Sequence, residues 1–117
     1  MTELDIKKYL KSSYNSHVAH LLHLYLMNDY SYYQQSFLPA VEYAKRKIKK
    51  GDYNSILFVQ CIKLGIDKTL GNYYFRKTYY DLPKKIDLAT RYHVADEIAR
   101  YIEDDYLNYK RRWSVGR

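Results

Sequence analysis

Three histidines close together in the sequence could do metal chemistry, because neighbouring imidazoles can bind zinc. They are His17, His20 and His23. At about 100° per residue on a helix, His20 and His23 share one side, whereas His17 lies near the border of an apolar stripe centred on Val18. A zinc site takes three or four protein ligands, and no CxxC motif accompanies the histidines. We therefore predict solvated histidines and no bound metal.

A group of carboxylates in the last third of the chain could form a two-metal site. The sequence from Arg91 to Arg112 mixes these carboxylates with basic residues. Alternating charges along a helix are typical of a solvated face with intrahelical pairs, such as Asp96 with Arg100. We therefore expect a solvated face and no metal here. The carboxylates are Asp96, Glu97, Glu103, Asp104 and Asp105.

Covalent catalysis through tyrosine is a third possibility in a chain with 16 tyrosines. Tyrosine recombinases and rolling-circle nickases also need a cationic or paired-histidine site, and His20 and His23 do not have the nickase spacing. Arg91 and His93 are too close together for the helical ribonuclease pattern. Neither GxxxxGK[ST] nor GxGxxG is present, which removes two nucleotide-binding motifs. We expect a protein that is not an enzyme and needs no cofactor.

The net charge of +7 falls entirely in the middle of the chain. Residues 1–40 hold three basic and three acidic side chains, and residues 86–117 hold six of each. Residues 41–85 hold eleven basic and four acidic side chains, and 11 − 4 gives the whole excess of +7. A segregated positive field attracts a polyanion or an acidic protein surface.

The basic middle segment also contains aromatic residues, so it combines charge for phosphates with rings for bases. Tyrosine and arginine are equally typical of protein interfaces, where lysine is depleted. A third interpretation is that the rings belong to the core and the lysines only increase solubility. The predicted binding residues are Lys45, Arg46, Lys49, Lys50, Tyr73, Tyr74, Arg76, Lys77, Tyr79 and Tyr80.

Helical periodicity in the first half of the chain predicts the elements that position these residues. Thr2 can cap a short first helix, and an apolar stripe from Tyr14 to Tyr25 predicts a second that ends at Asn28-Asp29. A third helix follows, capped by Asp29 or Ser31 and interrupted or restarted at Pro39, because proline removes an amide donor. Gly51 ends this helix.

The second half is also predicted to be helical. Asp52 or Asn54 caps a central, buried helix from Ser55 to about Leu64, and glycines 65 and 71 break the pattern. Residues 72–80 are expected to be irregular or a short helix, although their tyrosines also favour a strand. Asp87 caps the longest helix, which reaches about Tyr109. We predict an all-α fold, a single compact bundle of four to six helices in one domain spanning residues 1–117.

Length and composition fit one soluble domain. The chain has 117 residues, 47% of them hydrophobic, which is enough for a single core. It contains no apolar run for a bilayer span, and its amino terminus lacks the pattern of a secretory signal. We therefore expect a cytoplasmic protein without a membrane partner. The single Cys61 lies in an apolar run, where a small buried side chain is expected.

The chain contains Tyr14-Asn15-Ser16-His17, followed by Leu24-Tyr25-Leu26 and by Asn28-Asp29-Tyr30-Ser31-Tyr32-Tyr33, the last with an Asn-Asp-x-x-x-Tyr pattern. These segments resemble small proteins of phages and plasmids, and the stretch from 14 to 33 that contains them is about a sixth of the chain. It implies an accessory protein of a mobile element, a class that often blocks host defence or replication. It transfers no catalytic residue.

Two functions follow as expectations. The first is a non-enzymatic, phage-type protein that binds and inhibits a host protein or protein–nucleic acid complex, such as a restriction or CRISPR effector, with tyrosines as interface anchors. The alternative is direct binding of DNA or RNA by the basic middle segment, by a monomer or a homodimer.

Overall fold

The computed structural model describes residues 2–108, which form seven helical elements and, within that range, no strand. The predicted all-α bundle is confirmed. In chain order the elements are α1 (Glu3–Lys11), α2 (Ser16–Asn28), α3 (Tyr30–Lys50), α4 (Ser55–Leu70), α5 (Tyr73–Thr78), α6 (Leu88–Ile102) and the π-helical turn η1 (Glu103–Asn108).

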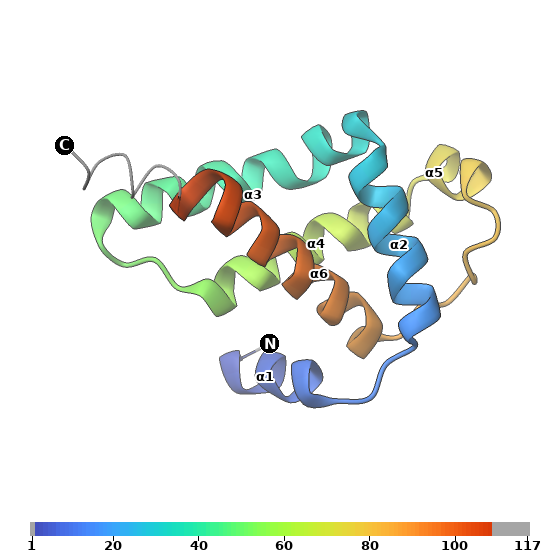
Figure 1. Cartoon of the computed structure of the whole chain (residues 1–117), viewed down its shortest axis with the longest axis horizontal. Coiled ribbons are helices and arrows are strands. Elements are labelled where there is room, and N and C mark those ends of the chain that lie inside the picture. Colours follow the sequence, from blue (N-terminus) through green and yellow to red (C-terminus); the bar gives the residue numbers. More distant parts are fainter. Residues whose placement is uncertain (1, 109–117) are drawn as a thin grey trace.

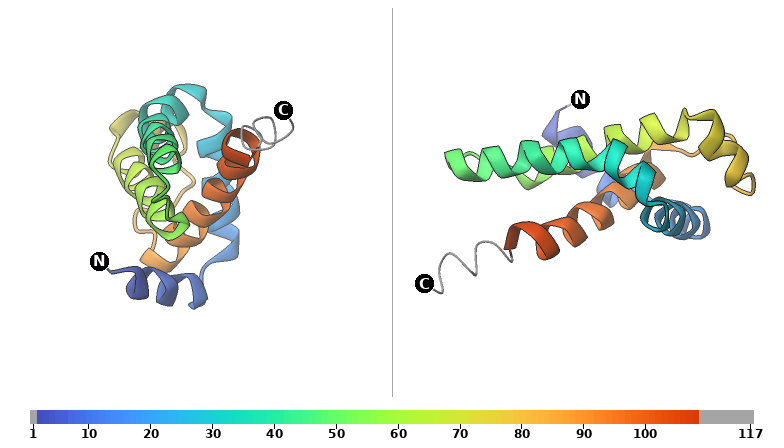
Figure 2. Two further views of the ribbon diagram at one scale, coloured as in Figure 1. Left: turned by 90° about the vertical axis from the view of Figure 1, so that its left-hand side faces the viewer. Right: turned by 90° about the horizontal axis from the view of Figure 1, so that it is seen from above.

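The helix α4 is the centre of the bundle and packs against both α3 and α6 (Figure 1). The helices α1 and α2 also pack against α6, and α1 contacts α4 as well. Seen from above, α3 and α4 form one layer, and α6 crosses beneath it beside α2 (Figure 2). The short α5 follows the end of α4 and lies apart from α6.

Side-chain caps explain where the helices begin. Thr2 caps the start of α1, as the sequence predicted, and does so through a capping box with Asp5. Asn15, Asn54 and Asp87 each accept a hydrogen bond from a backbone amide in the first turn of α2, α4 and α6, which satisfies donors that a helix start leaves free. At the other end of α3, Gly51 has φ 80° and ends the helix in the left-handed conformation.

The core is built from aliphatic and aromatic side chains that every α-helix contributes. The largest side chains with almost no exposed surface are Tyr92, Phe37, Phe58, Phe75, Ile6, Leu22, Leu26, Ile62, Ile66, Ile98 and Ile102. Burial of such side chains is the main term that stabilises a domain of this size.

Two predicted helix boundaries are wrong. The helix α3 runs through Pro39 without a break. Gln35, the residue four positions earlier, is exposed like Pro39, so water can hydrate the carbonyl oxygen that loses its amide donor. The helix α4 likewise runs through Gly65 to Leu70. Gly65 is buried against α3, so its missing side chain serves helix packing and does not end the helix.

The remaining elements lie where the sequence predicted them, but the helix after Asp87 is not the longest: α6 has 15 residues, whereas α3, which continues through Pro39, has 21. Residues 73–78 form the short helix α5, one of the two expected outcomes for residues 72–80. The last helix begins after Asp87 and continues through η1 to Asn108. Its predicted end near Tyr109 lies outside the described residues.

Candidate functional site

Most tyrosines in the described residues pack against other rings. Tyr9 stacks on the buried Tyr92 with centroids 5.5 Å apart, and Tyr25 stacks on Tyr79 at 4.3 Å. Tyr32 meets Phe75 edge to face at 5.1 Å. For these residues the interpretation of tyrosine as a core residue holds.

Four other tyrosines are exposed at the end of the molecule that carries α5. Tyr30, Tyr73, Tyr74 and Tyr80 expose 70%, 68%, 71% and 85% of their surface, and we call these four residues the tyrosine surface. Tyr73 and Tyr74 contact each other edge to face at 5.5 Å. Tyr30 was not among the predicted binding residues. Its position in the segment with the Asn-Asp-x-x-x-Tyr pattern is the one feature of the sequence that could have indicated it.

Contacts between α5 and the start of α3 hold the tyrosine surface together. Asn72 caps α5 by accepting from the amide of Phe75, and its side-chain oxygen also accepts from the Tyr32 hydroxyl. Asp29, between α2 and α3, accepts a hydrogen bond from the Tyr79 hydroxyl at 3.3 Å. Phe75 is fully buried and anchors α5 to the core. The exposed rings therefore stand on a short helix that is fixed by its buried face.

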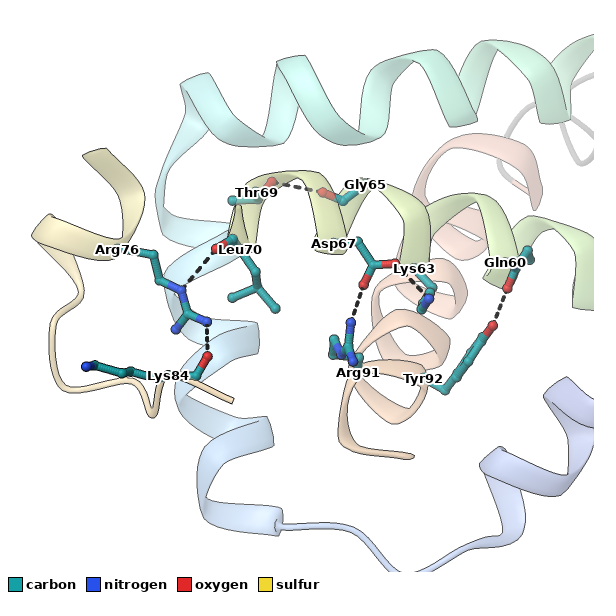
Figure 3. A network of polar contacts seen from close by, with 10 residues as sticks. All are labelled: Gln60, Lys63, Gly65, Asp67, Thr69, Leu70, Arg76, Lys84, Arg91 and Tyr92. Carbon is teal, nitrogen blue, oxygen red and sulfur yellow. Dashed lines mark hydrogen bonds and ion pairs between the residues drawn. The ribbon is translucent and has the colours of Figure 1, made fainter. Parts of the chain in front are cut away.

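The predicted binding residue Arg76 has a structural role. Its guanidinium donates to three backbone carbonyl oxygens, those of Leu70, Pro83 and Lys84, at 3.0, 2.8 and 2.8 Å. Figure 3 shows the side chain linking the end of α4 to the segment before α6. Arginine can make these three bonds at once because its donors lie in a fixed plane.

Tyr79, another predicted binding residue, is only partly exposed. Its ring packs between Tyr25 and Phe75, and burial, together with the nearby Asp29 carboxylate, raises the pKa of its hydroxyl. Lys77 is exposed, as predicted, and lies beside the tyrosine surface on α5.

The four predicted cations of α3 lie far from α5. Residues 45–50 are at the end of α3 where α4 begins, and α5 follows the opposite end of α4 (Figure 1). The helix α4 lies between the two groups. It has 16 residues and is therefore roughly 24 Å long at a rise of 1.5 Å per residue. The predicted binding residues therefore form two separate surfaces. At the α3 end, Lys45 pairs with Glu42, while Arg46, Lys49 and Lys50 are exposed.

The histidines occur in different surroundings. His17 and His20 are exposed, and His23 Nδ1 lies 2.7 Å from the Glu97 carboxylate. Within residues 2–108, no three His, Cys, Asp or Glu side chains come together in a way that could hold a metal ion. The expected pair of Asp96 with Arg100 is present at 3.0 Å.

Cys61 is partly buried and packs against the core. Burial raises the pKa of its thiol, which lowers the fraction of reactive thiolate at neutral pH. This agrees with the expected packing role, although its burial is less complete than the apolar run suggested.

No protein-family model matches the chain, and neither a curated protein nor a solved structure was found to be similar to it. None of the helices within the described range combines the length and apolar character that a membrane crossing requires. The chemistry of the site must therefore be inferred from the residues themselves.

Proposed function

We propose that this chain is a non-enzymatic binding protein whose partner contacts the tyrosine surface. The observation that carries the proposal is the exposure of four tyrosines, each at 68% or more, at one end of a bundle whose other described rings are mostly in the core or packed against it. Large exposed aromatic side chains are costly to leave in water and are typical anchors of protein interfaces. A protein partner uses both the ring and the hydroxyl of each.

The class of partner comes from the sequence resemblance. As an accessory protein of a phage or plasmid, the chain would bind a host protein or protein–nucleic acid complex in the cytoplasm and inhibit it, a restriction or CRISPR effector being the proposed target. The corner between α2 and α3 contains the resembling Asn28-Asp29 segment. Because Asp29 contacts Tyr79 across this corner, the segment supports the tyrosine surface.

The experiment is affinity capture from the native host with three forms of the chain, each with and without nuclease. The test variant is Tyr73→Ala/Tyr74→Ala, and the control is Tyr101→Ala, which removes a ring that is 50% exposed on α6. We expect wild type and control to retain one protein partner after nuclease treatment and the test variant to lose it. Equal capture by all three forms would refute the tyrosine surface as the interface.

Direct binding of DNA or RNA is the second candidate, and the exposed cations Arg46, Lys49 and Lys50 at the end of α3 favour it. The two candidates differ in salt dependence. The logarithm of the affinity for DNA falls with the logarithm of salt concentration with a slope of about −0.9 per neutralised phosphate, whereas an apolar tyrosine interface is much less sensitive. A steep slope that flattens in Lys49→Glu/Lys50→Glu would establish nucleic-acid binding.

A further inference from the structure

A groove of about 650 Å³ lies between the start of α2, the end of α4 and the segment that leads into α6. It is distinct from the tyrosine surface, since none of the four exposed tyrosines lines it. Its volume is in the range of about 300 to 1,000 Å³ that is typical of small-molecule sites. The groove is also not lined by any of residues 45–50 at the end of α3. Neither of the two candidate functions above therefore gives it a role.

The groove is strongly basic. It is lined by four cationic side chains and by one acidic side chain. The acidic residue, Asp87, is engaged in the fold, because its carboxylate accepts from the backbone amide of Thr90 at 2.8 Å. The cations are Arg76, Lys84, Lys85 and Arg91.

Two of the cations are held in place by the fold. Arg76 is fixed by backbone carbonyl oxygens, which carry no formal charge and leave its positive charge uncompensated. Arg91 donates to Asp67 at 2.8 Å, but Asp67 also pairs with Lys63 at 2.7 Å (Figure 3). One carboxylate thus serves two cations. In addition, Arg91 Nε is buried without a hydrogen-bond partner among the described residues, so the guanidinium retains a donor that the fold does not use.

The other two cations that line the groove, Lys84 and Lys85, are exposed, so they are free to reorient toward a bound anion. The first turn of α6 contributes Thr90 and Arg91 to the lining, and the positive end of the helix dipole adds to the same field. Two cations fixed by the fold and two exposed cations that can reorient are together suited to binding more than one phosphate group.

The remaining lining is apolar. Val18, Leu70, Pro83 and Ile86 all line the groove, and such a surface suits an uncharged organic group more than a second charged one. A ligand that fits both the basic and the apolar lining of the groove carries phosphates at one end and a flat or apolar group at the other.

We propose that this groove binds a small organic phosphate of nucleotide size, with its phosphates held by Arg76, Lys84, Lys85 and Arg91 and its uncharged part against the apolar lining. The same phosphate chemistry occurs in the backbone of a nucleic acid. The location of the cations favours a free ligand over a long strand, because a strand would have to follow a continuous basic surface, whereas the exposed cations of residues 45–50 lie at the opposite end of α4 from this groove.

The test uses the full chain labelled with ¹⁵N and titrated with ATP, inorganic pyrophosphate and a single-stranded oligonucleotide. We expect ATP to shift the amide signals of residues 84–91 at lower concentration than pyrophosphate, because only ATP can use the apolar lining. If pyrophosphate bound as tightly as ATP, the proposal that the apolar lining holds an uncharged organic group would be refuted. An oligonucleotide that binds more tightly than ATP and also shifts residues 45–50 would refute a small ligand.

Charge reversal supplies the matched control. Lys84→Glu/Lys85→Glu changes exposed side chains in the groove, and Lys49→Glu/Lys50→Glu makes the same change of charge at the far end of α3. We expect the affinity for ATP to fall at least tenfold in the first variant and less than twofold in the second. Equal losses would show a diffuse attraction to net charge and overturn the proposal, as would the absence of ATP binding to the wild type.

Discussion

Gly65 of α4 lies so close to Ser36 of α3 that a Cβ atom at position 65 would stand 2.5 Å from the Ser36 carbonyl oxygen. The contact is with backbone, which cannot rotate away as a flexible side chain would. Thr69 strengthens the same contact, because its hydroxyl lies within hydrogen-bond distance of the Ser36 hydroxyl and donates to the Gly65 carbonyl oxygen. The distance between α3 and α4 therefore depends on the absence of a side chain at position 65.

The first prediction is that Gly65→Ala destabilises the protein. Overpacking costs about 1 to 3 kcal/mol, and a Cβ atom 2.5 Å from a backbone oxygen belongs at the upper end of that range. Because alanine recovers about 1 kcal/mol of helix propensity, we expect a net loss of up to about 2 kcal/mol in the free energy of unfolding. Urea denaturation of wild type and variant measures this difference in the free energy of unfolding. The control is Gly71→Ala, where the new Cβ would be 3.5 Å from its nearest neighbour and stability should stay within about 1 kcal/mol of wild type. Similar effects of the two substitutions would contradict the close contact.

The second prediction concerns Arg76. Hydrogen bonds from a charged group contribute about 1.5 to 3 kcal/mol, so Arg76→Ala should destabilise the segment between α5 and α6. Lysine cannot reach three carbonyl oxygens with one ammonium group, so Arg76→Lys should not restore it. Limited trypsin digestion should cut after Lys84 and Lys85 faster in both variants than in wild type.

Lys77→Ala is the control for this experiment, because Lys77 is exposed on the same helix and surface substitutions usually change stability by within about 0.5 kcal/mol. Unchanged digestion of Arg76→Ala would mean that the three hydrogen bonds do not hold the segment.

The third prediction is that Cys61 reacts slowly in the native protein. Its thiol pKa is raised by burial, so at pH 8 it should react with a disulfide reagent more slowly than an unfolded control in denaturant. We expect Cys61→Ala to cost about 1 to 3 kcal/mol, the common range for a substitution that removes buried packing, and to leave partner binding unchanged. Rapid labelling that abolishes binding would show a functional thiol.

Helix existence and most helix starts could be predicted from the sequence because both depend on neighbouring residues. The caps at Thr2, Asn54 and Asp87 follow from side-chain oxygens placed before apolar periodic segments. The predicted helix ends at Pro39 and Gly65 were wrong because tertiary structure, and not the neighbouring sequence, determines whether the helix continues at these positions. Pro39 lies on an exposed side of α3, and Gly65 is needed where α3 touches α4.

The candidate site could be predicted only in part for the same reason. Tyr73, Tyr74 and Tyr80 are exposed as an interface requires, but Tyr79, adjacent in sequence, is packed against Tyr25. Composition cannot separate these roles, since ring and hydroxyl suit both. The basic residues of the middle segment appear continuous in sequence, yet α4 carries them to opposite ends of the bundle. The groove was not foreseen, because Arg91 lies outside the basic segment and joins Arg76 only through the fold.

The last prediction is a pH dependence that arises from Asp87, the N-cap of α6. Hydrogen bonds from the side chain and the backbone amide of Thr90 lower the pKa of its carboxyl group, as expected for a carboxylate whose charged form accepts hydrogen bonds. The ordinary pKa of aspartate is about 3.9. Because the folded value is the lower one, the ionised cap stabilises the folded state fully above the ordinary value, and this contribution is lost as the pH falls through the folded value.

Asp87→Asn tests this directly, because asparagine is an equally good N-cap residue but does not titrate. We expect the wild type to be more stable than the variant at pH 7, since the charged cap also interacts favourably with the helix dipole. The difference in free energy of unfolding should shrink as the pH is lowered from 5 to 2. The measurement is urea denaturation of both proteins across this range. A difference that stays constant, or that grows on acidification, would show that the Asp87 carboxylate does not stabilise α6 through its charge.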